Sequence, residues 1–141
     1  MRILRIHHVA IAVDEMGPLT QFLSSDLGLG TPYLETRPSS NLDIAMFAAG
    51  NAGVELLHPT GPGSSVPAFM AERGAGLFHV CFEVDDIVDA MAELTAKGLR
   101  FRTKEPQPGH HGTRVAFIDP ASSGGVLFEL LEAPAEAATH T

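Results

Sequence analysis

Two histidines and two glutamates in this 141-residue sequence have the types and spacing of a metal site. His8 and His79 each lie in an apolar stretch rich in β-branched residues, and Glu55 and Glu129 each begin a Glu-Leu-Leu segment. A carboxylate on an apolar strand is costly to bury unless it is paired or bound to an ion. Imidazole and carboxylate ligands together suit a divalent ion such as Co²⁺, Mn²⁺, Ni²⁺, Zn²⁺ or Mg²⁺. The sequence therefore predicts one divalent ion held by these four residues.

The four residues come as two pairs from an internal repeat. The segment His8-Val9-Ala10-Ile11-Ala12-Val13-Asp14 resembles His79-Val80-Cys81-Phe82-Glu83-Val84-Asp85. Each segment precedes a helical stretch, and each half later reaches its Glu-Leu-Leu strand. A period of about 70 residues is too long for a solenoid. It indicates a duplicated module of the α+β class.

Hydrophobic periodicity predicts one helix and several strands in each half. Period-two alternation indicates strands over 3–13 and 78–84. Helical spacing predicts helices over 18–27 and 86–97, with Asp85 as an N-cap. In the first helix the inward face is predicted to hold Leu19, Phe22, Leu23 and Leu27. Shorter strands are predicted at 31–36, 42–48, 53–58, 101–103, 113–118 and 126–131.

Strand alternation predicts which side chains can share a face, because successive side chains of a strand point to opposite sides. In all four ligand-bearing strands, the bulky apolar neighbours of the ligand fall on the other face. That packing face holds Val9, Ile11, Val13, Val54, Leu56, Val80, Phe82, Val84, Phe128 and Leu130. We therefore expect each half to offer one histidine and one glutamate on the side away from its helix.

The whole chain is predicted to be a single domain over residues 1–141. The first module covers about 3–60, a linking helix about 64–73 and the second module about 76–132. The tail, 133–141, is predicted to be frayed. The expected fold consists of two tandem βαβββ modules that form a curved mixed sheet around a metal-binding cleft.

Composition indicates which classes of partner and which cellular location to expect. The net charge of −8, without a basic cluster, argues against nucleic acid as a partner. No apolar run reaches the roughly 18 residues that span a bilayer, and the N-terminus lacks the apolar block of a secretory signal. A cytoplasmic protein without a membrane partner is expected. The single cysteine, Cys81, forbids an internal disulfide and is predicted to be a buried thiol.

Most of the chain resembles the vicinal oxygen chelate superfamily, which includes glyoxalase I, extradiol dioxygenases and methylmalonyl-CoA epimerases. Within it the sequence is most similar to the methylmalonyl-CoA epimerase family. The resemblance covers residues 6–131. It is carried by the segments Ile6-His7-His8-Val9-Ala10-Ile11-Ala12-Val13, Val54-Glu55-Leu56-Leu57-His58-Pro59, His79-Val80-Cys81-Phe82-Glu83-Val84-Asp85-Asp86-Ile87 and Gly124-Gly125-Val126-Leu127-Phe128-Glu129-Leu130.

The resemblance implies an isomerase that epimerises methylmalonyl-CoA or a related 2-substituted acyl-CoA. A proton would leave C2 and a metal-stabilised enolate would form, with Co²⁺ the commonest ion and a homodimer the usual assembly. Glu129 and Glu55 are the candidate bases, in addition to their predicted role as ligands. Two positions depart from the family: Asp119-Pro120 replaces the usual His-Pro, and Ile44, next to Asp43, stands where some members carry a glutamate.

Two other functions are compatible with this resemblance. The first is a glyoxalase-type lyase or isomerase that uses the same ligands on a thiol adduct. The second is a metal-free ligand-binding or resistance protein of the same fold, which would need no set of four ligands. A ring-cleaving dioxygenase is a weaker candidate, because it would use two histidines and one glutamate with iron.

Overall fold

The structure, a computed structural model, describes residues 1–135 and divides them into two compact units. The first unit is His8–Phe78; the second combines Met1–His7 with the described residues from His79 onward. Strand β1, Ile3–Ala12, therefore contributes to both units. The sequence-based division into modules and a linking helix stays a prediction. Most of the predicted frayed tail, 136–141, lies outside the described residues.

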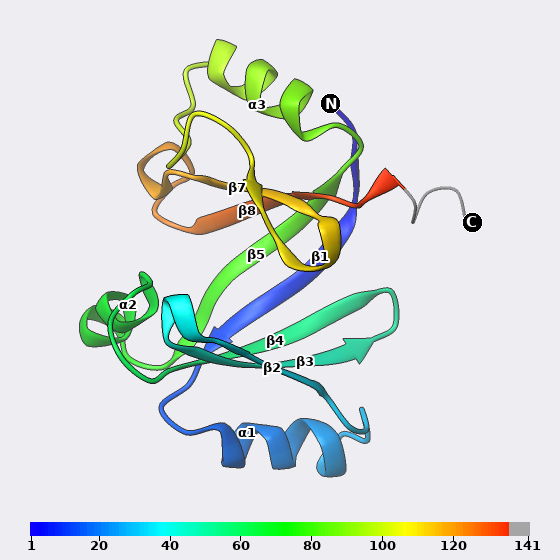
Figure 1. The fold of residues 1–141 in the computed structure, drawn as a ribbon, viewed down its shortest axis with the longest axis vertical. Helices are drawn as coiled ribbons and strands as arrows, with labels where there is room; N and C mark the ends of the chain where they lie inside the picture. The colour runs from blue at the N-terminus through cyan, green and yellow to red at the C-terminus, as the bar shows by residue number, and fades with distance from the viewer. Residues whose placement is uncertain (136–141) are drawn as a thin grey trace. The chain divides into compact units, whose positions relative to one another are not determined.

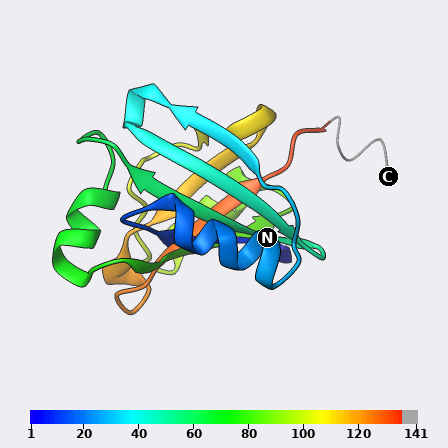
Figure 2. The same ribbon diagram turned by 90° about the horizontal axis from the view of Figure 1, so that it is seen from below.

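The first unit has a mixed sheet with the strand order β2-β3-β4-β1. Strands β1 and β4 are parallel, and the other neighbouring pairs are antiparallel. Helix α1 lies along one face of this sheet, as Figures 1 and 2 show from two directions. The elements after β1 are α1 (Met16–Gln21), η1 (Phe22–Asp26), β2 (Tyr33–Arg37), β3 (Leu42–Ala49), β4 (Ala52–Pro59) and α2 (Val66–Arg73).

The core of the first unit lies between its sheet and the helical segment that follows β1. Its buried residues are Val13, Leu23, Ala45, Phe47 and Leu56. Ile11, Val54, Met16, Leu19 and Leu29 pack against them. The alternation expected for β1 and β4 is thereby confirmed, since their bulky side chains join the helix-side core.

The C-terminal part of the first predicted helix is not α-helical. The α-helix gives way at Phe22 to a π-helical turn, in which the Leu27 N–H donates to the Phe22 carbonyl over 2.8 Å. A π turn advances the chain by an extra residue and rotates later side chains relative to α-helical spacing. Leu27, which follows this turn, is 58% exposed, and Phe22, where the turn begins, is 44% exposed, whereas Leu23 is 7% exposed. Placing Phe22 and Leu27 on the buried face was wrong.

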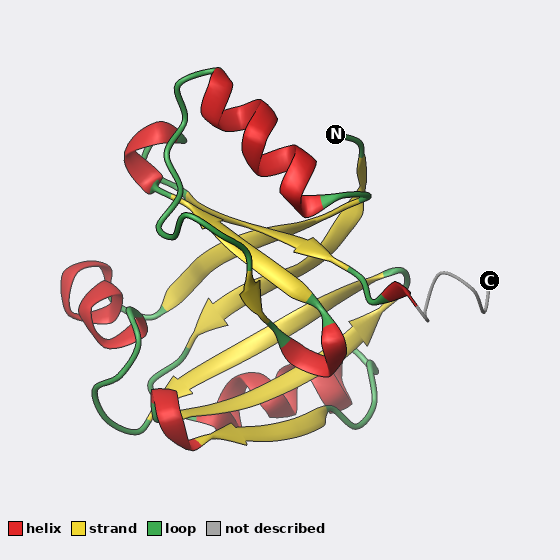
Figure 3. Cartoon of the chain, turned by 45° about the horizontal axis from the view of Figure 1, so that its top comes forward, coloured by secondary structure: helices red, strands yellow, loops and turns green. Residues whose placement is uncertain are grey.

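The second unit repeats this architecture, with the strand order β5-β8-β7-β6. Its first and last long strands, β5 and β8, are parallel, and the remaining pairs are antiparallel. Helix α3 runs along the strands of this unit, as seen in Figure 3. The elements are β5 (Gly76–Val84), α3 (Ile87–Ala96), β6 (Gln107–Pro108), η3 (His110–Gly112), β7 (Arg114–Ile118) and β8 (Leu127–Glu132). The repeated order confirms the α+β class and the two βαβββ modules.

The core of the second unit lies beneath α3 and matches the core of the first. Its buried residues are Val84, Ile87, Ala90, Met91, Ala116, Ile118 and Leu130. Phe82, Leu94, Leu99, Phe101 and Phe128 pack against this cluster. The packing face predicted for β5 and β8 is confirmed. Among residues 1–135, no helix is long and apolar enough to cross a membrane.

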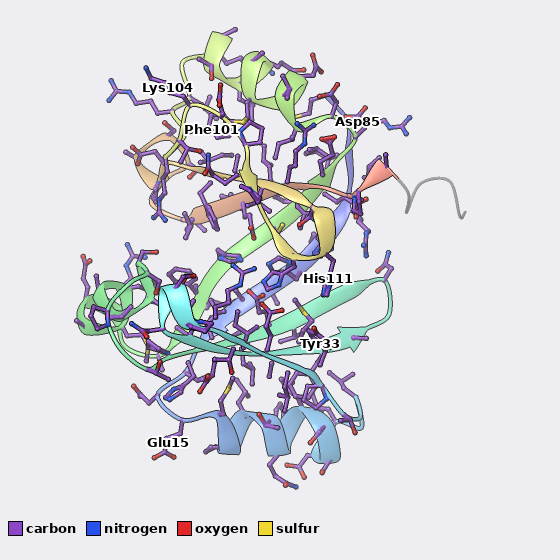
Figure 4. All side chains as sticks on the ribbon, in the orientation of Figure 1. Glu15, Tyr33, Asp85, Phe101, Lys104 and His111 are labelled. Atoms are coloured by element: carbon purple, nitrogen blue, oxygen red, sulfur yellow. The ribbon has the colours of Figure 1, made fainter. Side chains whose placement is uncertain are left out.

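Two local predictions in the second unit were wrong. Residues 101–103 do not form a strand: Phe101 makes an isolated bridge to Ile118, and β6 at 107–108 is the edge strand beside β7. The N-cap of α3 is Asp86, whose Oδ1 accepts from the Asp89 N–H over 3.0 Å. Asp85 instead accepts from the backbone N–H of Arg2 over 2.8 Å. Figure 4 labels Asp85 where β5 meets the start of α3.

Candidate metal centre

In the first unit, β1 and β4 bring His8 and Glu55 together on the sheet face that α1 does not cover; we call it the ligand face. In the parallel register Ala10 pairs with Glu55, so His8 is two residues before the partner of that glutamate. Side chains two residues apart on a strand share a face. His8 Nε2 lies 3.7 Å from Glu55 Oε1, and the two residues are 5% and 7% exposed. The predicted first pair is confirmed as neighbours.

The second unit brings His79 and Glu129 together in the same manner. Cys81 pairs with Glu129 in the parallel register of β5 and β8, and His79 precedes Cys81 by two. His79 Nε2 lies 3.1 Å from Glu129 Oε1, and the two residues are 5% and 7% exposed. The Phe117 ring meets the His79 ring edge-on, with centroids 5.6 Å apart. The second predicted pair is therefore also formed.

Burial separates these four residues from the other polar side chains. Among residues 1–135, the polar or charged residues in the buried class are His8, Glu55, His79 and Glu129. A buried carboxylate needs a counter-charge or hydrogen bonds to offset its lost hydration. In each pair, an imidazole nitrogen and a carboxylate oxygen face one another. Both are atoms that coordinate borderline divalent ions. The residues present therefore fit the predicted metal.

Small and flexible residues surround the pair in the first unit. Gly53 pairs with His8 on one side and with Ala48 on the other. A Cβ at Gly53 would lie 2.7 Å from Met46 Sδ and 3.5 Å from His8 Cβ. Met46 itself pairs directly with Glu55. The absence of a side chain at Gly53 thus leaves room for the Met46 thioether beside both proposed ligands.

Cys81 lies on the same face of β5 as His79, because it is two residues further along the strand and pairs with Glu129. Cys81 is buried, as predicted for a structural thiol. His58 belongs to β4, but it is three residues from Glu55 and therefore lies on the opposite face. Its Nδ1 lies 3.3 Å from the Val13 carbonyl oxygen. Asp43 pairs with His58 and also lies on that opposite face. Neither His58 nor Asp43 joins the ligand face.

Three polar residues of β2 on the ligand face were missed by sequence reasoning. Tyr33, Glu35 and Arg37 pair with Met46, Ile44 and Leu42, respectively. Directly paired residues of antiparallel strands project from the same face. Alternation within a strand places Tyr33 and Glu35 on one face, which is the signal that the sequence offers. Only the register of β2 on β3 shows which face it is.

An open groove in the second unit lies on the helix side of its sheet. It has a volume of about 590 Å³, and one of its lining residues, Lys104, is labelled in Figure 4. Its lining comes from α3 and nearby segments: Val88, Met91, Ala92, Thr95, Lys104, Glu105, Pro106 and Arg114. None of the four proposed ligands contributes to it. The groove is therefore separate from the candidate metal centre.

Comparison with known proteins identifies the same family over most of the chain. Residues 7–117 match the family described as the Glyoxalase/Bleomycin resistance protein/Dioxygenase superfamily. Mitochondrial methylmalonyl-CoA epimerase of Mus musculus is 36% identical over 130 residues, which cover 92% of this chain and 73% of the mouse protein. Ethylmalonyl-CoA/methylmalonyl-CoA epimerase of Cereibacter sphaeroides is 34% identical over 128 residues, covering 89% of this chain and 96% of that protein.

A solved structure shares both the fold and the sequence pattern. It is described as methylmalonyl-CoA epimerase in complex with methylmalonyl-CoA and NH4+. Its TM-score with this chain is 0.84 at 28% sequence identity, over 95% of this chain and 97% of the other. The likeness therefore extends over both compact units.

Proposed function

Because the chain belongs to the glyoxalase/bleomycin resistance/dioxygenase superfamily, and within it to the methylmalonyl-CoA epimerases, we propose that it epimerises methylmalonyl-CoA or a related 2-substituted acyl-CoA. Family membership makes the chain an enzyme of the isomerase class. The methylmalonyl-CoA in the similar structure supports an acyl-CoA as the substrate. The observation that carries the proposal is the burial of two histidine–glutamate pairs on repeated strands.

The proposed cofactor is one divalent ion, with Co²⁺ first among the candidates and Mn²⁺, Ni²⁺, Zn²⁺ or Mg²⁺ as others. His8, Glu55, His79 and Glu129 would hold it. The internal repeat supports this proposal, because each unit presents one His–Glu pair in the same parallel register. When bound, the ion would act as a Lewis acid that stabilises negative charge developing on the substrate's carbonyl oxygen.

The protein's own part in the reaction is proton transfer at C2. Glu129 or Glu55 would accept the C2 proton as a carboxylate, while the electron pair of the C–H bond moves toward the carbonyl and gives an enolate. Reprotonation of C2 on the opposite face then yields the other epimer. Burial of both glutamates, at 7% exposure each, would keep bulk water from competing for the carbanion-like centre.

We propose a homodimeric assembly and a cytoplasmic location for this protein. A homodimer is supported by Leu4 and Ile6, which are 44% and 46% exposed and share one face of β1. Exposed apolar side chains that neighbour one another on one face are typical of surfaces that bind a partner. Size-exclusion chromatography with light scattering tests this assembly. A cytoplasmic location belongs to the same proposal, and cell fractionation tests it.

The decisive experiment follows one pure epimer of methylmalonyl-CoA in deuterated buffer with metal-loaded protein. We expect inversion at C2 with incorporation of one deuterium. Glu129→Gln should slow inversion by about 100-fold or more, because general acid–base groups contribute on that scale. The exposed Glu72 supplies a matched control, and Glu72→Gln should leave the rate unchanged. Metal-loaded wild-type protein that neither inverts nor exchanges the substrate would refute the epimerase function.

A further inference from the structure

The edge strand of the first unit carries a glutamate on the ligand face. Glu35 of β2 pairs with Ile44 of β3, and Ile44 pairs with Leu57 of β4. Leu57 is two residues from Glu55 along the same strand. Because direct partners in antiparallel strands and residues two apart in one strand share a face, Glu35 and Glu55 project from the same side of the sheet.

The spacing of these strands allows both carboxylates to approach one small group that lies over the ligand face. Neighbouring strands are about 4.8 Å apart, so two steps from β2 to β4 span about 10 Å. A two-residue offset along a strand adds about 7 Å in the perpendicular direction. Glu35 and Glu55 thus rise from separate points of one face, and a small acyl group lying over that face could be approached by both side chains from different directions.

A neighbour on its own strand holds the Glu35 carboxylate. Arg37 Nε donates a hydrogen bond to Glu35 Oε2 over 3.1 Å. The side chains of Glu35 and Arg37 are 22% and 35% exposed, so both are partly sheltered from solvent. A charge-assisted bond of this kind fixes direction as well as distance. Glu35 is therefore oriented, and is not a freely rotating surface carboxylate.

Inversion at C2 needs a proton donor on the face opposite to the base. Apart from His8 and Glu55, the titratable residues that β1–β4 place on the ligand face are Tyr33, Glu35 and Arg37. Arginine does not give up its proton in proteins, and Tyr33 is 57% exposed, whereas the Glu35 side chain is 22% exposed and held by Arg37. A carboxyl group takes up and releases protons in ordinary acid–base catalysis. Glu35 is thus the side chain on β2 that suits reversible proton transfer.

We propose that Glu35 is the second proton-transfer residue of the epimerisation and that Arg37 is its positioning residue. The inference rests on the proposed function. In one direction a carboxylate of the ligand set takes the C2 proton, and the C–H electron pair enters the enolate. The Glu35 carboxyl then gives its proton to C2 on the other face, and the enolate electrons form the new C–H bond. In the reverse direction Glu35 accepts the proton, so the atoms and charges balance.

The test separates inversion from hydrogen exchange in metal-loaded Glu35→Gln protein. Each epimer is incubated in deuterated buffer, and both C2 configuration and deuterium content are followed. We expect inversion to fall by about 100-fold or more. One epimer should still exchange its C2 hydrogen with retention of configuration, because the first base remains. The other epimer should lose exchange together with inversion. A merely structural defect would slow exchange of both epimers equally.

Matched variants keep the test decisive. Asp43→Asn removes a carboxylate from the neighbouring strand on the opposite face, where Thr36 Oγ1 donates to it over 3.3 Å, and should leave both rates unchanged. Glu35→Asp retains a carboxyl group and should recover part of the inversion. Binding of 2-nitronate-propionyl-CoA and metal content should stay at wild-type values in Glu35→Gln protein. Unchanged inversion in Glu35→Gln, or equal loss of exchange for both epimers, overturns the role of Glu35. Inactive wild-type protein refutes the proposed function itself.

Discussion

His79 Nε2 lies 3.1 Å from Glu129 Oε1, and the same strand relationship joins His8 to Glu55 at 3.7 Å in the other unit. In both units the histidine is two residues before the parallel partner of the glutamate. Two sequence repeats that fold alike thereby reproduce one arrangement of donor atoms. This recurrence is what distinguishes the pairs from isolated buried histidines.

Replacement of one ligand should remove the metal and leave the fold intact. In His79→Ala, one imidazole donor is lost from the proposed set, so we expect most of the bound Co²⁺ to be lost after desalting. His110→Ala, in the η3 turn, is the matched control and should retain its metal. Metal content is measured by mass spectrometry and folding by circular dichroism. Wild-type metal content in folded His79→Ala protein would contradict the ligand assignment.

Substitution of Gly53 should disturb the ligand face more than the fold. The added methyl group would lie 2.7 Å from Met46 Sδ, the movable end of a flexible side chain. Displacing Met46 costs little in stability, and alanine is entropically favoured over glycine by about 0.5–1 kcal/mol. We therefore expect Gly53→Ala to change unfolding stability by about 1 kcal/mol or less while weakening metal binding.

Gly17 supplies the control for that substitution. It lies in α1, where a methyl group added to its Cα would meet no atom of another segment within 4 Å, and so Gly17→Ala should leave metal affinity unchanged. Urea unfolding and metal titration of both variants measure the two effects. Equal metal affinity in Gly53→Ala and wild-type protein would show that the position of Met46 does not matter to the site.

Asp85 should contribute stability that depends on pH. Its pKa is lowered from the ordinary value of 3.8, chiefly because the Arg2 backbone N–H donates to the carboxylate. Since the folded-state pKa is depressed, the stabilisation is present above about pH 4 and is lost as the pH falls through the folded-state pKa. Asp85→Asn should therefore be less stable than wild type at pH 7, with a difference that shrinks below pH 4. Urea unfolding across this range measures it; a difference independent of pH would argue against this contact.

Two adjacent residues at the start of the π turn should respond differently to truncation. Leu23 is 7% exposed in the core of the first unit, and Phe22 is 44% exposed. Leu23→Ala should lower the free energy of unfolding by about 2–5 kcal/mol, as is usual for buried leucines. Phe22→Ala should cost much less despite the larger side chain. Thermal unfolding of both variants compares them; an equal or greater loss for Phe22→Ala would contradict the burial of Leu23 and the exposure of Phe22.

Sequence alone determined the duplicated modules, the packing faces of the long strands and the four buried polar residues. These features depend on local periodicity: a strand with alternating bulky and small side chains has one face that must be buried, whichever strand becomes its neighbour. For the same reason His8 and Glu55 could be assigned to one kind of face before any contact was known.

Tertiary structure decided the features that depend on pairing between distant segments. The register of β2 on β3 places Glu35 beside Ile44, the position where the sequence lacks an acidic residue. No local pattern specifies that register, because a slip of one residue would send Glu35 to the opposite face. Likewise, the Asp85 carboxylate accepts a hydrogen bond from the Arg2 backbone N–H, and Asp86 is the N-cap of α3. A hydrogen bond between residues 83 positions apart is visible only in the folded chain.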